Sequence, residues 1–593
     1  MSASLPSRVP GWGLAGFLAG VALVPWLAPN AYIVQVLAFT GLSAMMAVGL
    51  NLLIGYAGQV SLGHAGFYGL GAYVSGVLGA KLGLSPWIGM PVAACATGIL
   101  AYVVGIPTLK LKSYYLAMAT LGIGIILHLA FVQLYWWTGG SSGLAGIPPW
   151  DVGPLHFTTD LAHYYLIWTF AGIALWLAWN LVNSAVGRAL RAVGDSEVAA
   201  SAMGVDAARA KRSVFVLSAV YASVAGSLYA HYITVISPEI FSFLASVVLI
   251  LMVAIGGIGR FWGPVLGALL LTVLPEYLRV YGDYEVPLYG LALIVVMLFL
   301  PRGLAGLLER GAARDAAIRV EPIAPARVPA ATGAGPLLEV RGLSKDFGGV
   351  RAVHHCSFEV QPGEIKAVIG PNGAGKTTLF NVVSGVYPPT AGEVTFAGRR
   401  LTGMPSHEIA RLGIYRTFQN VQLFGSLSVV ENVMIGGARR DPDDFVGAIL
   451  GLRRQIAADR DRLARALGCL ALVGLDALAL TPAASLPFGQ QKLVEVARAL
   501  AGEPALLLLD EPAAGLNTTE KVEMMRLIGR LRTLGLAVLI IEHDMRLVMG
   551  VSDRVVVLNY GEKIAEGTPA EVQADPAVIK VYLGEDVATH ARG

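Results

Sequence analysis

The charged residues of this chain are distributed very unevenly, and this asymmetry limits the folds that the sequence can adopt. Lys and Arg number 43 and Asp and Glu number 40, yet residues 1–301 hold only 20 of these charges. The overall charged fraction of 14% is well below the ~25% that is typical of soluble proteins. A chain of 593 residues is also too long for one ordinary domain. We therefore predict a membrane-embedded first half and a water-soluble second half.

Ten apolar runs in the first half are long enough to cross a bilayer as helices, which takes about 17 to 25 residues. They lie near residues 11–29, 31–56, 64–82, 85–106, 114–137, 162–182, 213–236, 243–260, 262–279 and 285–301. The first run could be a secretory signal, but the next one starts at Ala31 with no hydrophilic segment between them, so we interpret it as a retained span. The short breaks at residues 30, 83 and 261 could be re-entrant turns, which leaves the number of spans open.

The basic residues favour a cytosolic N-terminus, because loops on the cytosolic side carry an excess of Lys and Arg. With ten crossings, the cytosolic side receives Arg8, Lys110, Lys112, the loop from Arg188 to Arg212, Arg260 and Arg302. The opposite side receives Asp151, Asp160, Asp283 and Glu285, whereas Lys81 and Arg279 disagree with this orientation. We therefore expect a multi-pass protein of the cytoplasmic membrane with its second half in the cytosol.

Two histidines and one stretch of small residues stand out within the predicted spans. Ionisable groups inside a membrane domain are candidates for function, and His64 and His128 both qualify. For each of them we favour a neutral, hydrogen-bonded structural histidine. Residues 51–73 are rich in small side chains, which either let helices approach closely or line a path through the membrane.

The second half begins after residues 302–336, which are rich in Pro and Ala and predict a linker. From residue 337 to 585, apolar strands alternate with helical segments, which is typical of an α/β P-loop ATPase. Residues 586–593 form a tail. The three cysteines lie far apart, so neither a disulfide framework nor a zinc cluster is indicated.

A phosphate-binding loop follows the apolar run KAVI in this half. It comprises Gly370, Pro371, Asn372, Gly373, Ala374, Gly375, Lys376, Thr377 and Thr378. The glycines let backbone N–H groups surround phosphates, and Lys376 reaches the β- and γ-phosphate oxygens. The hydroxyl of Thr377 is a candidate ligand of Mg²⁺. ATP and Mg²⁺ are therefore the expected cofactors.

Further motifs follow in an order that resembles the ABC ATPases. They are KDFGG with Phe347, YRTFQN with Gln419, LPFGQQ at 486–491, ALLLLDEP at 505–512, AGLN at 514–517 and IEHD with His543. The resemblance implies that Phe347 stacks on adenine, and that Gln419 contacts Mg²⁺ and senses the membrane subunit. It also implies that Gly489 and Gln490 contact nucleotide phosphate as part of the signature.

Residue chemistry at the end of the ALLLLDEP strand agrees with this resemblance. Asp510 ends a buried apolar strand, where its carboxylate can bind Mg²⁺ directly or through water. Glu511 can polarise the attacking water, and His543 can hydrogen-bond both the γ-phosphate and Glu511. Pro487, Phe488 and Asn517 depart from the general ABC pattern in a way that looks like the amino-acid importer ATPases, and Pro487 lacks a backbone donor.

Four stretches of the membrane half resemble the permease subunit of the branched-chain amino acid ABC importers. They are residues 51–73, 109–122, 138–148 and 187–205. The last lies in the polar loop 184–213 and resembles the loop that couples such permeases to their ATPases, a match carried by Glu197, Ala199, Ala200 and Gly204. Small alanines on one helical face can fit a groove on an ATPase while Glu197 and the flanking arginines fix their orientation. A solvated amphipathic loop would have a similar sequence.

Together these features predict a polytopic α-helical membrane domain fused to an ABC ATPase, forming half of an importer. The resemblance implies a second permease and ATPase, or a second copy of this chain, together with an external solute-binding protein. It does not imply nucleic acid. Branched-chain amino acids are the predicted solute, and urea, short amides and aromatic acids are alternatives. Other hypotheses are an ABC exporter and an ATP-sensing membrane protein that hydrolyses nothing.

Overall fold

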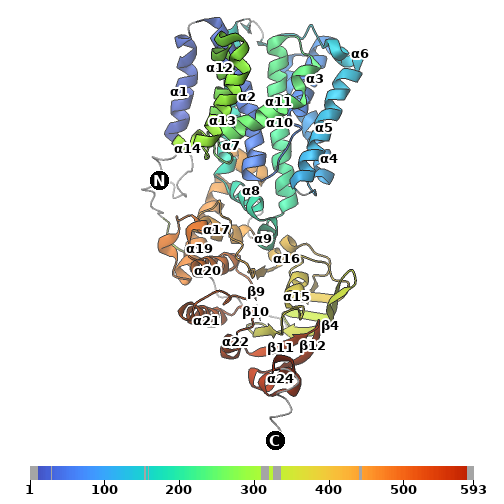
Figure 1. Cartoon of the computed structure of the whole chain (residues 1–593), viewed down its shortest axis with the longest axis vertical. Coiled ribbons are helices and arrows are strands. Elements are labelled where there is room, and N and C mark those ends of the chain that lie inside the picture. Colours follow the sequence, from blue (N-terminus) through green and yellow to red (C-terminus); the bar gives the residue numbers. More distant parts are fainter. Residues whose placement is uncertain are drawn as a thin grey trace.

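The computed structural model describes residues 11–28, 30–111, 113–152, 155–157, 159–308, 320–324, 335–439 and 444–583. These residues form a helical bundle and an α/β domain that follow each other along the long axis of the molecule (Figure 1). The apolar first half of the chain builds the bundle, and the charged second half builds the α/β domain. The predicted tail 586–593 lies outside the described residues.

A helix is present at each of the ten predicted spans. Their bounds are α1 (Gly11–Leu27), α2 (Ala31–Asn51) with the π-helical turn η1 (Leu52–Tyr56), α3 (His64–Leu82), α4 (Pro86–Thr108), α5 (Ser113–Gln133), α7 (Asp160–Val182), α10 (Ala207–Ile233), α11 (Phe243–Gly256), α12 (Gly263–Leu278) and α13 (Glu285–Phe299). Within the described residues, six helices are long and apolar enough to cross a membrane. These six helices confirm the polytopic membrane domain. Among the other predicted spans, α1, α11 and α13 have only 17, 14 and 15 residues, so the count of ten stays a prediction.

Short elements connect these helices. They are α6 (Tyr135–Thr138), η2 (Gly140–Ser142), the hairpin of β1 (Asp151–Val152) and β2 (Leu155–His156), η3 (Pro238–Phe241), η4 (Arg279–Tyr284) and α14 (Ala305–Leu308). Between α7 and α10, the helices α8 (Ala185–Asp195) and α9 (Glu197–Ala202) lie between the bundle and the α/β domain (Figure 1).

Small residues and a buried histidine fix the packing of α3 on α10. A side chain at Gly71 would clash with the backbone of Ser223, and one at Gly226 would clash with the backbone of Tyr68. His64 is fully buried, and its two ring nitrogens lie 3.0 Å from Ser61 Oγ and 2.6 Å from Ser218 Oγ. These contacts support the structural interpretation of His64 and a packing role for the small residues of α3.

The α/β domain contains two sheets. The larger has the strand order β12 (Glu562–Gly567), β11 (Arg554–Asn559), β5 (Ile365–Ile369), β10 (Ala537–Ile541), β9 (Leu506–Asp510) and β8 (Ile414–Arg416), in which only the β11–β12 pair is antiparallel. The smaller, antiparallel sheet has the order β4 (Val350–Val360), β3 (Leu338–Phe347), β6 (Ala391–Phe396) and β7 (Arg399–Arg400). The strands β5, β9 and β10 are buried along their whole length, as expected for parallel strands covered on both faces.

The helices of this half surround the sheets, except for the helix at residues 445–450, which packs on α7 of the membrane half. They are α15 (Lys376–Val383), α16 (Ser406–Leu412), α17 (Val429–Gly436), α18 (Phe445–Leu450), α19 (Arg453–Leu472), α20 (Phe488–Leu500), α21 (Thr518–Thr533), α22 (Met545–Val551), α23 (Pro569–Ala574) and α24 (Pro576–Leu583), with the 3₁₀ turns η6 (Gly437–Arg439), η7 (Asp476–Leu478) and η8 (Ala483–Ser485). The parallel strands β5 and β9 end at the same edge of the sheet, which brings the phosphate loop after β5 close to Asp510 and Glu511 after β9.

Part of the predicted linker packs against the ATPase. Of its residues 302–336, the ranges 309–319 and 325–334 lie outside the described residues. The backbone N–H of Ile323 donates to Ala464 O of α19 at 2.9 Å, and Val320 packs against the core of the α/β domain. This segment therefore contacts α19, although its composition predicts little capacity for burial.

Candidate functional site

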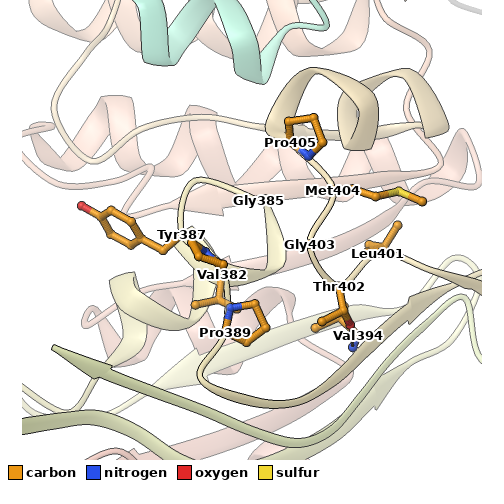
Figure 2. A pocket seen from close by; sticks show the side chains of 11 residues that line it. Val382, Gly385, Tyr387, Pro389, Val394, Leu401, Thr402, Gly403, Met404 and Pro405 are labelled. Atoms are coloured by element: carbon orange, nitrogen blue, oxygen red, sulfur yellow. Dashed lines mark hydrogen bonds between the residues drawn. The ribbon is translucent and has the colours of Figure 1, made fainter. Parts of the chain in front are cut away.

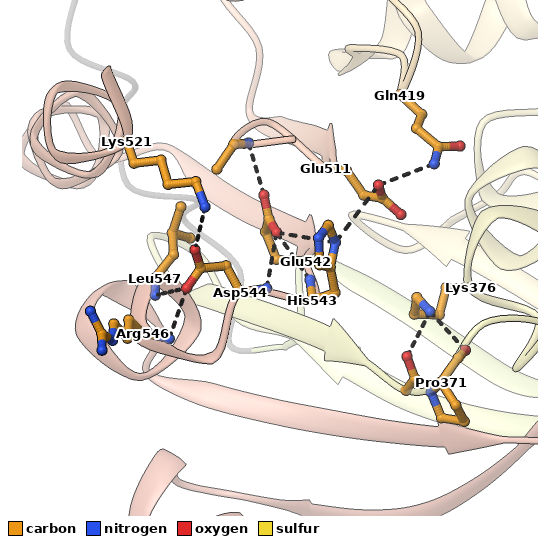
Figure 3. Close-up of polar contacts among 12 residues, drawn as sticks. Pro371, Lys376, Gln419, Glu511, Lys521, Glu542, His543, Asp544, Arg546 and Leu547 are labelled. Atoms are coloured by element: carbon orange, nitrogen blue, oxygen red, sulfur yellow. Dashed lines mark hydrogen bonds and ion pairs between the residues drawn. The ribbon is translucent and has the colours of Figure 1, made fainter. Parts of the chain in front are cut away.

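The predicted phosphate loop joins β5 to α15. Gly373 and Gly375 have φ angles of 83° and 93°, in the left-handed region that favours glycine. The Nζ atom of Lys376 donates to the carbonyl oxygens of Gly370 at 2.7 Å and Pro371 at 3.0 Å (Figure 3). Burial lowers the pKa of Lys376, and the carboxylates of Glu511 and Asp510 oppose that effect. The lysine is thus folded over its own loop.

The other predicted residues of this loop continue it in order. Asn372 and Ala374 lie between the glycines, and Thr377 and Thr378 lie in the first turn of α15. The side chains of Lys376 and Thr377 therefore start from the same helical turn as the backbone N–H groups that would face a phosphate.

Asp510 is held by an arginine that the sequence analysis did not single out. It ends β9 with 1% of its surface exposed, and its Oδ2 accepts from Arg416 Nη2 at 2.7 Å. The same guanidinium donates through Nη1 to Asn381 Oδ1 at 2.6 Å and Ser384 Oγ at 3.1 Å. Burial raises the pKa of Asp510, and the charge of Arg416 acts against this rise. The arginine lies in YRTFQN, which the analysis used only for Gln419.

The structure brings Gln419, Glu511 and His543 together (Figure 3). Gln419 Nε2 donates to Glu511 Oε2 at 3.1 Å, and His543 Nδ1 lies 3.8 Å from the same oxygen. His543 Nδ1 also lies 3.7 Å from Glu542 Oε2. Glu511 has a φ angle of 47°, a strained conformation for a residue with a side chain. Such strain is found where the surroundings force a functional side chain into position.

The carboxylate of Asp510 fits a magnesium ion. Its Oδ1 is buried, and within the described part of the chain it has no hydrogen-bond partner. Mg²⁺ prefers oxygen ligands and is usually bound through one or two protein groups plus phosphates and water. Across the described residues no group of three His, Cys, Asp or Glu side chains could hold a metal alone. Asp510, Thr377 and Gln419 would therefore share the ion with the nucleotide.

Phe347 ends β3 with an exposed ring, as a platform for a base would require. Its side chain is 42% exposed, and its ring lies edge-on to Tyr387 with centroids 5.3 Å apart. Lys345 Nζ lies 5.0 Å from the centroid of the Phe347 ring. Tyr387 also borders a cavity of about 220 Å³, lined mainly by apolar side chains and by the backbone between Leu401 and Pro405 (Figure 2). No motif in the sequence indicates this cavity.

The signature, LPFGQQ at residues 486–491, lies at the start of α20 and packs against α21 and the segment before it. Pro487 is the residue before the helix, where its missing N–H removes no helical hydrogen bond. Phe488 is 46% exposed and lies against Gly515. Gly489 packs against the carboxylate of Glu520, which a side chain at this position would displace, and Gln490 follows it in the first turn.

The other departure, Asn517, is explained by a helix cap. Its Oδ1 accepts from Glu520 N at 3.0 Å, and Glu520 Oε2 accepts from Asn517 N at 2.9 Å. This reciprocal pair starts α21. Asn517 therefore serves as the N-cap of α21.

The predicted coupling loop packs on the α/β domain. Ala199 and Ala200 of α9 are fully buried in the apolar core of that domain, which includes Phe424. Gly204 O accepts from Arg411 Nε of α16 at 3.2 Å. The small side chains thus fit the ATPase surface.

The polar contacts of this loop differ from the expectation for Glu197. Its carboxylate lies 2.5 Å from Lys211 Nζ of the membrane half, and among the described residues no hydrogen bond or ion pair joins the Glu197 carboxylate to the ATPase. Asp195 Oδ2 accepts instead from Ser426 N at 2.9 Å and Ser426 Oγ at 2.7 Å. Ser196 Oγ donates to Gln422 Oε1 at 3.0 Å, three residues after Gln419. Asp195 and Ser196 therefore orient the loop together with the flanking Arg188, which forms an ion pair with Asp459 of α19.

A buried lysine links the helix α20 to the backbone at Gln419 and Glu511. Lys492 Nζ donates to Gln419 O at 2.8 Å and to Glu511 O at 3.3 Å. Lys492 directly follows LPFGQQ, but the sequence alone does not indicate this contact, because it depends on how the chain folds.

Comparison with known families assigns both halves. The family described as "Branched-chain amino acid transport system / permease component" matches residues 32–301, and "ABC transporter" matches residues 353–514. "Branched-chain amino acid ATP-binding cassette transporter" matches residues 562–588. LivG of Salmonella typhimurium, a high-affinity branched-chain amino acid transport ATP-binding protein, is 45% identical over 251 residues, covering 42% of this chain and 98% of that protein. The chain belongs to the family of branched-chain amino acid ABC transporters.

Other relatives of the ATPase half cover similar ranges. BraF of Pseudomonas aeruginosa, a protein of the same description, is 43% identical over 42% of this chain and 98% of its own length. LptB of Escherichia coli, a lipopolysaccharide export system ATP-binding protein, is 37% identical over 42% of this chain and 98% of its own length. A solved ATP-binding cassette in its ADP conformation is 32% identical, with a TM-score of 0.38 over 42% of this chain and 100% of that chain.

These matches confirm an ABC importer that carries a permease and an ATPase in one chain. Hydrolysis of ATP is coupled to transport across a membrane that the chain crosses several times. The exporter and the non-hydrolysing sensor are therefore disfavoured.

Proposed function

We propose that this chain is half of an importer for branched-chain amino acids in the cytoplasmic membrane, with its ATPase in the cytosol. The main support is that the permease half and the C-terminal part of the ATPase both match families whose descriptions name branched-chain amino acids. The similarity to LptB shows that the ATPase half is related to ATPases of other transport systems. The membrane half therefore supplies most of the argument for the solute and for import.

The ATP site would act through residues at the edge of the large sheet. Lys376 would leave the carbonyls of Gly370 and Pro371 and pair with the β- and γ-phosphates. Bound Mg²⁺ would neutralise phosphate charge, held by Asp510, Thr377 and Gln419. Phe347 would stack on adenine. Backbone N–H groups from Gly370 to Thr378 would bind the phosphates.

Glu511 would take a proton from the attacking water, because its carboxylate lies at the end of β9 beside the phosphate loop. Its present hydrogen bond to Gln419 and its distance of 3.8 Å from His543 place all three around one position. His543 would then donate a hydrogen bond to the γ-phosphate. Gly489 and Gln490 would contact the nucleotide of a partner ATPase.

Coupling would run through the loop between α7 and α10. Ser196 contacts Gln422, which lies in the segment that follows Gln419, so a shift of Gln419 toward the metal would reach Ser196 through a few residues. Ala199, Ala200 and Gly204 would transmit that movement as a packed unit. Glu197 would stiffen the loop through Lys211.

We further propose the division into residues 1–301, 302–336, 337–585 and 586–593 as membrane domain, linker, ATPase and tail. The partners would be a second permease, a second ATPase or a second copy of this chain, and an external solute-binding protein.

Reconstitution tests the solute directly. The chain, the second permease and ATPase, and the binding protein would be placed in vesicles containing ATP, and uptake of labelled leucine would be measured. Unlabelled isoleucine and valine should compete, whereas urea, acetamide and phenylacetate should not. Competition by urea or by an amide alone would favour the alternative solutes, and the Glu511→Gln variant provides the background without hydrolysis.

A further inference from the structure

The short helix α18 leaves the ATPase and packs on the membrane bundle. In the last turn of α7, Asn180 Nδ2 donates to Ile449 O of α18 at 3.0 Å. Ala448 is 2% exposed and belongs to the apolar core of the bundle, with Phe445 and Ile449 packed against it. This segment, orange in Figure 1, reaches the lower end of α7. It therefore lies at the depth where a membrane-spanning helix ends.

Four large apolar side chains remain outside this contact. Val446 and Leu450 are 62% and 46% exposed, and their spacing of four residues places them on one side of α18. Leu452 and Ile456, at the junction with α19 and in its first turn, are 47% and 54% exposed. An apolar patch of this kind usually marks a surface for a protein or for a membrane.

Two arginines that adjoin the patch in sequence, and two tryptophans at the end of α7, distinguish these two partners. Arg453 and Arg454 are exposed, and within the described chain neither forms an ion pair. Trp176 and Trp179 lie in the last turns of α7, with Trp176 43% exposed. Tryptophan gathers where a membrane meets water, and unpaired arginines beside apolar side chains match anionic headgroups above acyl chains.

We propose that residues 445–456, the α18 segment, bind the membrane leaflet on the ATPase side and contact anionic phospholipid. Val446, Leu450, Leu452 and Ile456 enter the boundary between headgroups and acyl chains, while the two arginines stay at the headgroups. Asp459 of α19 forms an ion pair with Arg188 of α8 only a few residues further on. Lipid binding therefore steadies the ATPase beside the loop that couples it to the bundle.

Lipid contact can be measured on the full chain in nanodiscs. The background is Cys95→Ser, because Cys95 is exposed whereas Cys356 and Cys469 are buried. A fluorophore is attached at Leu450→Cys, or at Val522→Cys on α21 as a control that is similarly exposed but distant from the bundle. Phospholipid with a spin-labelled acyl chain should quench the Leu450→Cys probe at least about threefold more strongly than the control. Equal quenching overturns the proposal.

A charge-reversal pair tests the headgroup contact. Arg453→Glu with Arg454→Glu should lower quenching of the Leu450→Cys probe about twofold in phosphatidylglycerol-containing nanodiscs, and less in phosphatidylcholine alone. Arg526→Glu with Arg530→Glu on α21 changes the same charge and should leave quenching unaltered. A probe that is quenched equally in both lipids and in all variants contradicts anionic recognition. Addition of the partner subunits must also leave the probe quenched, since a protein covering this face would shield it.

Discussion

Arg416 Nη2 lies 2.7 Å from Asp510 Oδ2, and the two side chains are 3% and 1% exposed. The arginine occupies one carboxylate oxygen and leaves Oδ1 without a partner in the described chain. Burial disfavours the charged carboxylate, and the neighbouring guanidinium favours it. The pair thus keeps Asp510 able to bind a cation while fixing which oxygen does so.

Removal of the positive charge of Arg416 should change the pH dependence of ATP hydrolysis. In Arg416→Met the carboxyl remains buried without its charge partner, so its pKa, already raised by burial, rises further. The carboxylate then forms only at higher pH, and ATPase activity near pH 7 should fall about tenfold or more with partial recovery in alkaline buffer. Steady-state hydrolysis measured against pH and Mg²⁺ concentration would show this shift.

Arg416→Lys is the matched control, because it keeps a cation and should retain a near-normal pH profile at reduced rate. An unchanged profile in Arg416→Met, with activity lowered equally at every pH, would mean that the arginine only supports the fold.

Glu511→Gln should separate binding from hydrolysis. The amide keeps the size of the side chain but cannot accept a proton from water, so turnover should fall about 10²-fold or more while ATP still binds. Hydrolysis and equilibrium nucleotide binding would be measured on the same sample. Glu523→Gln, on the exposed face of α21, controls for the loss of a charge, and normal turnover in Glu511→Gln would remove this residue from the catalytic step.

Lys376→Ala should instead weaken nucleotide binding. The variant removes the cation of the phosphate loop, so ATP affinity should drop about tenfold or more. Fluorescent nucleotide titration would measure this change. Lys521→Ala removes a lysine whose partly exposed ion pair with Asp544 is of little energetic weight, and its ATP affinity should stay normal. Equal affinities for the two variants would contradict the assigned role of Lys376.

The motifs and spans were predictable because each is encoded locally. Apolar runs locate the helices, and the glycine pattern from Gly370 to Gly375 requires the backbone angles that the structure has. The contact between Arg416 and Asp510 was not predictable, because it joins residues 94 positions apart and depends on the pairing of β8 with β9. The packing of α18 on α7 was not predictable either, because it also joins residues that are far apart in the sequence.

The orientation of the coupling loop shows a second limit of sequence reasoning. Glu197 carries the resemblance to other coupling loops, but the polar contacts with the ATPase involve Asp195, Ser196, Gly204 and Arg188 instead. A shift of one or two residues on a helix changes which side chain faces the partner. Only the packing of α9 on the ATPase decides between them.

A larger side chain at Ala200 should uncouple transport from hydrolysis. Ala200 is fully buried between the loop and the ATPase, so Ala200→Leu would force the two surfaces apart. Solute uptake per ATP hydrolysed should fall about fivefold or more, measured in parallel assays on vesicles. Val198→Leu enlarges a neighbouring side chain that is 50% exposed and should change the ratio little.

Glu197→Lys should have a similar effect for a different reason, because it places two cations together where Lys211 now pairs with the carboxylate. A proportional fall of uptake and hydrolysis in either variant, or no change in both, would argue against coupling through this loop.

The chain alone, as a monomer, should not transport. Lys376 lies over the phosphate loop, whereas the signature at Phe488 and Gly489 packs beside Gly515 and Glu520 with the Phe488 ring half exposed. Among the described residues, no hydrogen bond or ion pair joins the signature to the phosphate loop of its own chain, so the signature is free to complete the nucleotide site of another subunit. One chain also supplies a single coupling loop.

Transport and hydrolysis would be measured for the purified chain at concentrations where its mass is that of a monomer, and again after addition of the second permease and ATPase. Coupled uptake should require the partners, and the family resemblance favours distinct chains over a second copy. Recovery of transport by concentrating this chain alone would indicate a homodimer. Full transport by the monomer would contradict the half-transporter, because its single ATP site would then close without a signature from another subunit.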